Sequence, residues 1–260
     1  MSSRNASPAR TETSLNISGF RNSKRFLHFG RNDREGDATR QVFASLDVYD
    51  DIRSRSAALN MALDEALLEM AEIPSIRFYK WDHPALSFGY FGRFADVDEH
   101  RHQRDVVRRW TGGGIVFHGD DLTYSIVIPA AEPAFAESSM TIYEKIHNAI
   151  RAALVANGQS AELAANGAPK ISDSCFANPV RADVLSNGRK IAGAAQRRTR
   201  RGLLQQGSVQ DVDLTNEFGN QFASELCSNC YHKTLDERLI ARAHEIAEQK
   251  YGAASWLQRR

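Results

Sequence analysis

Several familiar signals are missing from this chain of 260 residues, and each absence removes a class of protein. Three cysteines in a chain of this length do not make a disulfide framework, so we expect a reducing cytoplasm, where a functional cysteine acts as a thiol or a metal ligand. No apolar run approaches the roughly 20 residues that span a bilayer. The formal net charge is +1, from 33 basic and 32 acidic residues, which gives no global signal for nucleic acid or a membrane surface.

The usual catalytic and metal motifs are also incomplete. The sequence has no Walker-type phosphate loop, and no full Ser/His/Asp set is legible in it. Cys227 and Cys230, together with His232, supply half of the ligands of a zinc site, and no second Cys/His pair has suitable spacing. The sequence therefore predicts no bound metal.

The composition does allow a sizeable core, because 42% of the residues are hydrophobic. Residues 1–41 differ from the rest: they are rich in Ser, Asn and Arg and lack apolar periodicity, so we expect a disordered basic tail. An organelle-targeting peptide is the alternative, but such peptides are poor in acidic residues. The tail contains Glu12, Asp33, Glu35 and Asp37. We expect the folded domain to comprise residues 42–260.

Apolar periodicity predicts strands interspersed with helices in this domain. We expect strands at residues 42–49, 75–81, 84–90, 122–128, 183–186, 189–195 and 203–210, a helix capped by Ser56 and running to about residue 72, and further helices at 96–103, 139–157, 214–226 and 235–251. Asn187-Gly188 is a strong signal for a type I′ hairpin turn. Antiparallel-style strands with interspersed helices favour an α+β domain over a doubly wound parallel sheet.

Two basic segments stand out. In the first, Arg108 and Arg109 precede three consecutive glycines, Gly112 to Gly114, and His118 follows. Glycine has no Cβ, so a ligand can lie close to its main chain. Spacing alone is equally compatible with an anion- or carbonyl-binding loop and with a glycine-rich hairpin turn. The second basic segment, residues 197–201, is either a solvated turn or a docking point for an acidic protein.

Two residues are candidates for a direct role in catalysis. Cys175 lies in a predicted loop at residues 165–182, where a thiol is placed for nucleophilic attack; the alternative is a small, half-buried loop residue. Lys190 follows the hairpin turn, and strand alternation places it on one face with Ala192 and Ala194. Such small neighbours leave room for a ligand, whereas the alternative is a solvated lysine on an edge strand.

Together these pieces resemble the lipoyl and octanoyl transferase and lipoate ligase family, which is related to the biotin protein ligases. The matching segments, in chain order, are residues 60–68, 84–91, 108–118 with 122–125, and 188–196 with 203–208. The third resembles the pattern Arg-Arg-x-x-Gly-Gly-Gly-x-Val-x-His, and the last resembles Gly-Arg-Lys-Ile-Ala-Gly-x-Ala-Gln. The resemblance implies a biotin/lipoyl ligase-like, class II synthetase-like domain with a mixed, largely antiparallel sheet flanked by helices.

Within the family, the chain is most similar to the cysteine-dependent octanoyltransferases. Cys175-Phe176, with Pro179 shortly after and Lys190 downstream, resembles the segment in which their acyl thioester forms. The resemblance implies transfer of an octanoyl (or lipoyl) group from acyl carrier protein, through Cys175 and assisted by Lys190, to a lipoyl-domain protein. The acceptor would be glycine cleavage H protein or 2-oxoacid dehydrogenase E2, and no cofactor is needed. The implied substrate-binding residues are Arg109, Thr111, Gly112, Gly113, Gly114, His118, Tyr124, Asp183, Gly193, Gln196 and Gly207.

Three alternatives stay open at this point. The first is an ATP- and Mg-dependent lipoate ligase that forms a lipoyl-adenylate, and the second is a transferase that moves the acyl group between lipoyl domains. The third is a non-catalytic binder of acylated proteins, which the presence of both Cys175 and Lys190 disfavours. Gly92 departs from the family pattern, which often has a polar residue such as Gln there. The choice between octanoyl and lipoyl, the acceptor, the oligomeric state and the role of the tail are not determined by the sequence.

Overall fold

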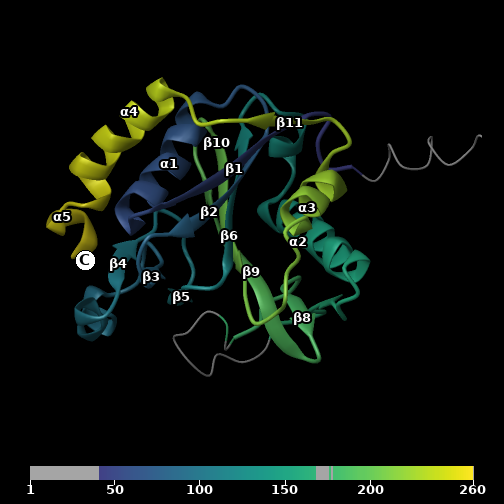
Figure 1. Ribbon diagram of the computed structural model, residues 1–260, viewed down its shortest axis with the longest axis horizontal. Helices are drawn as coiled ribbons and strands as arrows, with labels where there is room; N and C mark the ends of the chain where they lie inside the picture. Colours follow the sequence, from purple (N-terminus) through teal and green to yellow (C-terminus); the bar gives the residue numbers. More distant parts are fainter. Residues whose placement is uncertain (1–40, 168–175, 177, 260) are drawn as a thin grey trace, which may run out of the picture. The chain divides into compact units, whose positions relative to one another are not determined.

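An eight-stranded sheet is the frame of the unit Thr39–Arg260 in the computed structural model, which describes residues 41–167, 176 and 178–259. The strand order is β11-β1-β2-β6-β10-β9-β8-β7 (Figure 1). Among the described residues, the β11–β1 and β1–β2 pairings are parallel and the other five are antiparallel, which confirms the expected mixed, largely antiparallel sheet. In chain order its strands are β1 (Leu46–Arg55), β2 (Ser75–Trp81), β6 (Leu122–Pro129), β7 (Glu162–Leu163), β8 (Val184–Ser186), β9 (Arg189–Arg198), β10 (Gly202–Val209) and β11 (Cys230–Lys233).

A second, three-stranded sheet presents the glycine-rich segment. Its order is β4-β3-β5, with β3 (Ala85–Phe88) in the centre, parallel to β4 (Asp105–Arg108) and antiparallel to β5 (Val116–His118). The three glycines lie in the connection between β4 and β5. Between β3 and β4, the polar helix predicted at residues 96–103 is replaced by two short 3₁₀ segments, Phe94–Asp96 and Asp98–His102.

Helices cover both faces of the large sheet. α1 and α4 lie on one face, and α2 and α3 lie on the other (Figure 1). Ile126 of β6 belongs to the core beneath α2 and α3, while the next residue, Val127, belongs to the core beneath α1 and α4. Successive side chains of a strand point to opposite faces, so a strand covered on both sides is a continuous apolar run. The helices are α1 (Ala57–Met70), α2 (Ser139–Ala156), α3 (Phe218–Leu226), α4 (Glu237–Ile246) and α5 (Ala254–Leu257), with a short 3₁₀ segment at Pro133–Ala136.

Helix starts follow their capping residues. The Ser56 side chain accepts a hydrogen bond from the Leu59 N–H, as the predicted cap requires, and Asp236 caps α4 in the same way. The helix predicted from residue 235 to 251 ends as a regular α-helix at Ile246 and continues as a π-helical segment, Ala247–Tyr251. None of the helices in the described part of the chain is long and apolar enough to cross a membrane.

Some element boundaries differ from the predictions. β1 begins at Leu46, not at residue 42, and α3 begins at Phe218, not at residue 214. Strand β11 is not predicted by the sequence pattern, because its four residues are mostly exposed and carry no apolar alternation. Among the described strands, it pairs only with β1, at the edge of the sheet. The predicted tail, residues 1–41, lies outside the described residues except for its last one, so that assignment stays a prediction.

Candidate active site

The β8–β9 hairpin positions Lys190. Asn187 and Gly188 both have positive φ angles, of 50° and 75°, as the predicted type I′ turn requires. Val184 pairs with Ala192 but Leu185 pairs with Lys190, so one extra residue of β9 forms a β-bulge at this point. The bulge reverses the alternation along β9.

Because of this bulge, the Lys190 side chain lies on a different face of β9 from the one that the sequence predicts. A Cβ on Gly193 would lie 2.3 Å from Lys190 Cε, so the lysine side chain lies along the face that Gly193 presents. Ala192 instead belongs to the apolar core, and Ala194 packs against that core. The prediction that Lys190 shares a face with Ala192 and Ala194 is therefore wrong, because it assumed unbroken alternation.

Lys190 is held by a buried carboxylate. Its Nζ lies 2.8 Å from Asp183 Oδ2, and the two side chains are 2% and 0% exposed. Asp183 also accepts hydrogen bonds from the Tyr143 hydroxyl of α2 and from the Val180 N–H, at 2.7 Å for the latter. Burial and the charge of Asp183 raise the pKa of Tyr143 far above its ordinary value, so this hydroxyl stays a donor. The arrangement keeps an ammonium group at a fixed place inside the protein.

Arg109 organises the glycine-rich loop. Its guanidinium donates to the carbonyls of Gly112 and Gly114, at 3.0 and 2.8 Å, and to Ser87 Oγ at 2.7 Å. Gly113 has a φ of +87°, a conformation that favours glycine. A Cβ on Gly89 would lie 2.0 Å from the Gly113 carbonyl oxygen, so the two main chains are in direct contact. The glycines therefore serve a tight turn around the Arg109 side chain.

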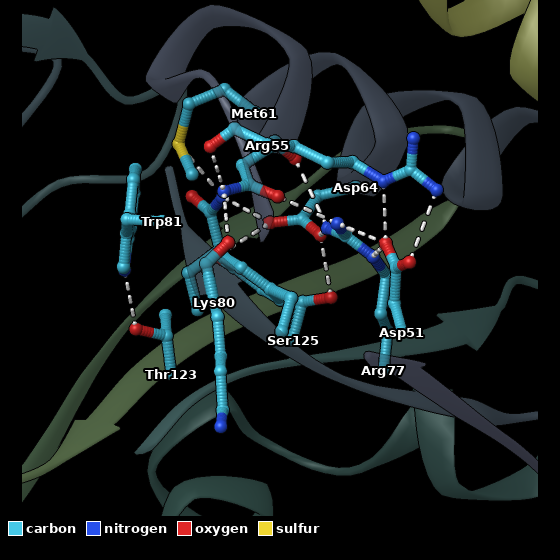
Figure 2. A network of polar contacts seen from close by, with 12 residues as sticks. Asp51, Arg55, Met61, Asp64, Arg77, Lys80, Trp81, Thr123 and Ser125 are labelled. Carbon is cyan, nitrogen blue, oxygen red and sulfur yellow. Dashed lines mark hydrogen bonds and ion pairs between the residues drawn. The ribbon is translucent and has the colours of Figure 1, made fainter. Parts of the chain in front are cut away.

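A buried network of charged residues supports this loop from behind. Thr111 donates to Gln206, and Gln206 donates to Asp64 of α1, at 2.8 and 2.7 Å. Asp64 in turn forms an ion pair with Arg77 at 3.0 Å, and both side chains are fully buried. Figure 2 shows Arg77 between Asp64 and Asp51, to which it is also paired. Removing one partner of such a pair is strongly destabilising, by about 3–5 kcal/mol.

The sequence contains a local signal for this network. Asn60 and Asp64 are four residues apart within the apolar face of α1, where Leu63 and Leu67 are also buried. Residues four apart lie on the same side of a helix. Polar groups inside an apolar stripe require buried partners, and Arg77 is the partner of both. The identity of that partner depends on the packing of β2 beneath the helix.

A small pocket lies beside these groups. Its wall combines apolar and aromatic side chains with a few polar ones, as ligand pockets commonly do. The described residues that line it are Met61, Tyr79, Trp81, Ser87, Arg109, Val116, His118, Thr123, Phe176, Gly193, Ala194, Ala195, Gln206, Gly207 and Ser208.

The predicted site residues take different positions around this pocket. Arg109, His118, Gly193 and Gly207 line it, with Lys190 and Asp183 behind Gly193. Thr111 is connected to it through Gln206. The other predicted residues are not among the described residues of the wall. Gly112 to Gly114 surround the Arg109 side chain, and the Tyr124 ring packs beneath Gly207. Gln196 donates a hydrogen bond to Gln205.

Cys175 lies outside the described residues. Its neighbour Phe176 is described, and the Phe176 ring lines the pocket. The Lys190 Nζ lies 5.3 Å from the centroid of that ring. Phe176, which follows Cys175 in the sequence, thus lies close to Lys190.

Three residues that the sequence did not connect meet at the pocket. His118 lies between Ser87 and Asp121: its Nε2 is 2.7 Å from Ser87 Oγ, and its Nδ1 is 2.8 Å from Asp121 Oδ2. Ser87 comes from β3 and His118 from β5, which are antiparallel neighbours 31 residues apart in the chain. No local spacing rule predicts such a set, because it depends on the register between two strands.

Two other sequence motifs, the Cys227/Cys230/His232 group and the basic segment 197–201, lie outside the pocket wall among the described residues. Cys227 is buried and accepts from the Asn229 N–H, while His232 is exposed. Within the described ranges, no group of three or more His, Cys, Asp or Glu residues is arranged to hold a metal. In the basic segment 197–201, the Arg197 guanidinium stacks over Tyr90, so part of this segment contacts the protein itself.

Comparison with known proteins gives the family. A family model for the lipoyl protein ligase A/B catalytic domain matches residues 56–229. The octanoyltransferase LipM of Oceanobacillus iheyensis is 42% identical over 164 residues, which cover 60% of this chain and 60% of that protein. The LipM of Staphylococcus epidermidis is 35% identical over 214 residues, covering 76% of this chain and 74% of that protein. The matched part of the chain thus spans about 60% of the length of the Oceanobacillus relative.

Solved structures show the same fold. A lipoate-protein ligase A bound with ATP superposes with a TM-score of 0.65 at 20% identity, covering 83% of this chain and 98% of that one. A bi-partite lipoate protein ligase from Thermoplasma acidophilum gives a TM-score of 0.62 at 20% identity, covering 83% and 96%. The family match, together with this fold, places the chain in the lipoyl protein ligase A/B catalytic domain family.

Proposed function

We propose that this chain is an octanoyltransferase of protein lipoylation. It takes an octanoyl group from acyl carrier protein onto Cys175 and passes it to the acceptor lysine of a lipoyl-domain protein. Relatives from several bacteria that are 29–42% identical to this chain are named octanoyltransferases, which supports this choice within the family. No cofactor takes part in the proposed reaction, because the acyl thioester is already activated.

The observation that carries the proposal is the buried Lys190 behind the pocket wall. Its ammonium is 2.8 Å from Asp183 and close to the Phe176 ring, next in the chain to Cys175. A positive charge near a cysteine favours the thiolate, which is the nucleophilic form. The same charge stabilises an oxyanion that forms on a substrate carbonyl in the pocket. The pocket wall supplies the apolar surface that an alkyl chain needs.

The two steps of the proposed reaction balance. In the first, the Cys175 sulfur forms a bond to the octanoyl carbon, the thiolate of the carrier leaves, and the proton lost by Cys175 passes to that thiolate. In the second, the acceptor amine forms a C–N bond, the bond to the Cys175 sulfur breaks, the departing Cys175 thiolate takes up a proton from the amine nitrogen, and the product is an amide. An amide is more stable than a thioester, so the second step drives the transfer forward.

Intact mass spectrometry tests the covalent step. We expect wild type incubated with octanoyl carrier protein to gain one octanoyl group, and Cys175→Ala to gain none. Cys230→Ala is the matched control, since it removes a half-buried cysteine outside the pocket and should load like wild type. No adduct on wild type, or an equal adduct on Cys175→Ala, contradicts the mechanism.

The alternatives give other outcomes in the same assay. Transfer that requires ATP together with free octanoate or lipoate selects the ligase reaction. Loading from an acylated lipoyl domain but not from the carrier protein selects transfer between lipoyl domains. Binding of acylated proteins with no loss of the donor acyl group selects a non-catalytic binder.

A further inference from the structure

Ser87, His118 and Asp121 form a chain of hydrogen bonds at the edge of the pocket, with consecutive polar atoms 2.7 and 2.8 Å apart. Ser87 and His118 are 1% and 5% exposed, and both line the pocket. The imidazole ring stacks on Trp81, with ring centroids 4.3 Å apart, which holds the plane of His118. These three groups are therefore fixed in the order that proton transfer along a chain requires.

The partners of Asp121 and Ser87 assign the direction of each hydrogen bond. Burial raises the pKa of Asp121, but hydrogen bonds from His118, Ser208 and a main-chain N–H, together with the charge that His118 carries when protonated, outweigh burial and lower it to about 2. Asp121 is thus a carboxylate, and His118 Nδ1 carries the proton that it accepts. Arg109 donates to Ser87 Oγ, which directs the serine hydroxyl proton toward His118 Nε2. His118 Nε2 is therefore the acceptor.

Transfer to a lysine needs such an acceptor, because a lysine side chain is an ammonium at neutral pH and attacks only as the free amine. Lys190 is engaged as the ammonium partner of Asp183, and removing its proton would leave a buried carboxylate unpaired. Tyr79 also lines the pocket, but its hydroxyl donates to Asp64, and burial holds its pKa well above the ordinary value. Among the described residues of the wall, His118 is therefore the group that can accept the proton of the acceptor lysine.

We propose that Ser87, His118 and Asp121 are the proton relay for attack by the acceptor lysine, an inference that rests on the proposed octanoyltransferase function. The acceptor ammonium gives one proton to Ser87 Oγ as the serine hydroxyl proton passes to His118 Nε2. The free amine then forms the C–N bond to the octanoyl carbon, and the bond to the Cys175 sulfur breaks. The second proton of the nitrogen moves to the Cys175 thiolate. The imidazolium finally releases its proton to water.

The charges around His118 suit a transient imidazolium. The Asp121 carboxylate, on the connection between β5 and β6, stabilises the charged ring through Nδ1. Arg109 donates to Ser87 at the other end of the relay and so holds the serine hydroxyl in place. Arg104 donates to the main-chain carbonyl of His118 and so faces its backbone. The relay can therefore accept a proton and return it.

Separating the two half-reactions tests this inference. We expect Ser87→Ala and His118→Gln still to form the octanoyl adduct, and the acyl-enzyme of each protein is isolated before its transfer step is timed. Transfer from the isolated acyl-enzyme to a lipoyl domain should be slower by about 100-fold or more, the usual contribution of a positioned base. Ser75→Ala is the matched control: Ser75 is an equally buried strand serine that does not line the pocket, and its transfer rate should equal that of wild type.

Hydroxylamine distinguishes a base from a merely structural residue. It is a neutral amine at pH 7 and needs no prior deprotonation, so it should cleave the acyl-enzymes of wild type and of both variants at equal rates. Wild-type transfer rates in both variants overturn the relay, and so does an equal loss of hydroxylamine cleavage, which indicates a displaced thioester. Ser87→Ala keeps the His118–Asp121 pair, so the test stands even where His118→Gln does not fold. No octanoyl adduct on wild type instead overturns the octanoyltransferase function itself.

Discussion

Lys190 and Asp183 form an ion pair with an N–O distance of 2.8 Å and side chains no more than 2% exposed. Two opposite charges in such surroundings depend on each other, because each is costly to bury alone. This mutual dependence makes the pair a sensitive probe of the site. The position of Lys190 also explains the glycine at residue 193 of β9, because the Lys190 side chain lies across it and leaves no room for a Cβ.

Breaking the pair should destabilise the protein, and removing both charges should restore much of the loss. We expect Lys190→Met and Asp183→Asn each to lower the free energy of unfolding by about 3–5 kcal/mol. The double variant should lose clearly less than the sum, because no charge is left unpaired, while octanoyl loading should stay low. Urea unfolding of the four proteins measures this cycle. Additivity within about 0.5 kcal/mol would show that the two groups are not coupled.

Gly193→Ala should displace Lys190 and leave the rest of the fold intact. The added Cβ would lie 2.3 Å from Lys190 Cε and 2.5 Å from its Nζ, so the ammonium must move. A shift of about 1 Å in a catalytic group costs on the order of 100-fold in rate. We expect that loss in the rate of octanoyl loading, measured by intact mass. Gly167→Ala is the control, because its Cβ would meet neighbours no nearer than 3.7 Å and should leave the rate unchanged.

His147 should make stability depend on pH in the acid range. Burial on α2 lowers the pKa of His147 to about 4, from 6.5 in the unfolded chain, despite the nearby charge of Asp183. Between these values the unfolded state binds the extra proton, so stability is complete above pH 6.5 and is lost as the pH falls toward 4. The expected loss is about 3 kcal/mol, since one pKa unit corresponds to roughly 1.4 kcal/mol.

Urea unfolding at several pH values between 4.5 and 7 measures this dependence. His147→Gln has no titrating ring and should show a flatter profile. His83→Gln, which replaces a histidine whose side chain is 76% exposed, should keep the wild-type profile. Equal profiles for wild type and His147→Gln would exclude His147 as the source of the acid sensitivity.

Arg108 should hold the last described residues in place. Its guanidinium is fully buried and donates to the carbonyls of Tyr90, Gly92, Trp256, Leu257 and Arg259. Arg108→Met removes this donor from the five carbonyls, most of which belong to partly buried residues, and a buried unsatisfied group costs about 1–3 kcal/mol. We expect a loss of at least about 3 kcal/mol in unfolding free energy and faster hydrogen exchange at residues 254–259.

An exposed arginine provides the comparison for this prediction. Arg101 forms a surface ion pair with Asp98 at 3.4 Å, and Arg101→Met should change the unfolding free energy by less than about 0.5 kcal/mol. Wild-type exchange rates at residues 254–259 in Arg108→Met would mean that other contacts, such as the packing of Trp256, hold this segment.

Local features were predictable where neighbouring residues determine them. Ser56 caps α1, residues 75–81 form β2, and Asn187-Gly188 forms the hairpin turn, since each depends on side-chain and backbone preferences within a few residues. The face of Lys190 was not predictable in this way. A bulge in β9 shifts the alternation by one residue, and its position depends on the pairing of β9 with β8.

By itself, the sequence determined the class of the fold, the family through motifs in consistent order, and the identity of most candidate residues. Only the tertiary structure decided which of these residues meet. Ser87 and His118 become neighbours through the register of β3 with β5, and Asp64 meets Arg77 through the packing of α1 on β2. Such contacts join residues far apart in the chain, so their partners are chosen by strand register and burial, which a linear pattern does not contain.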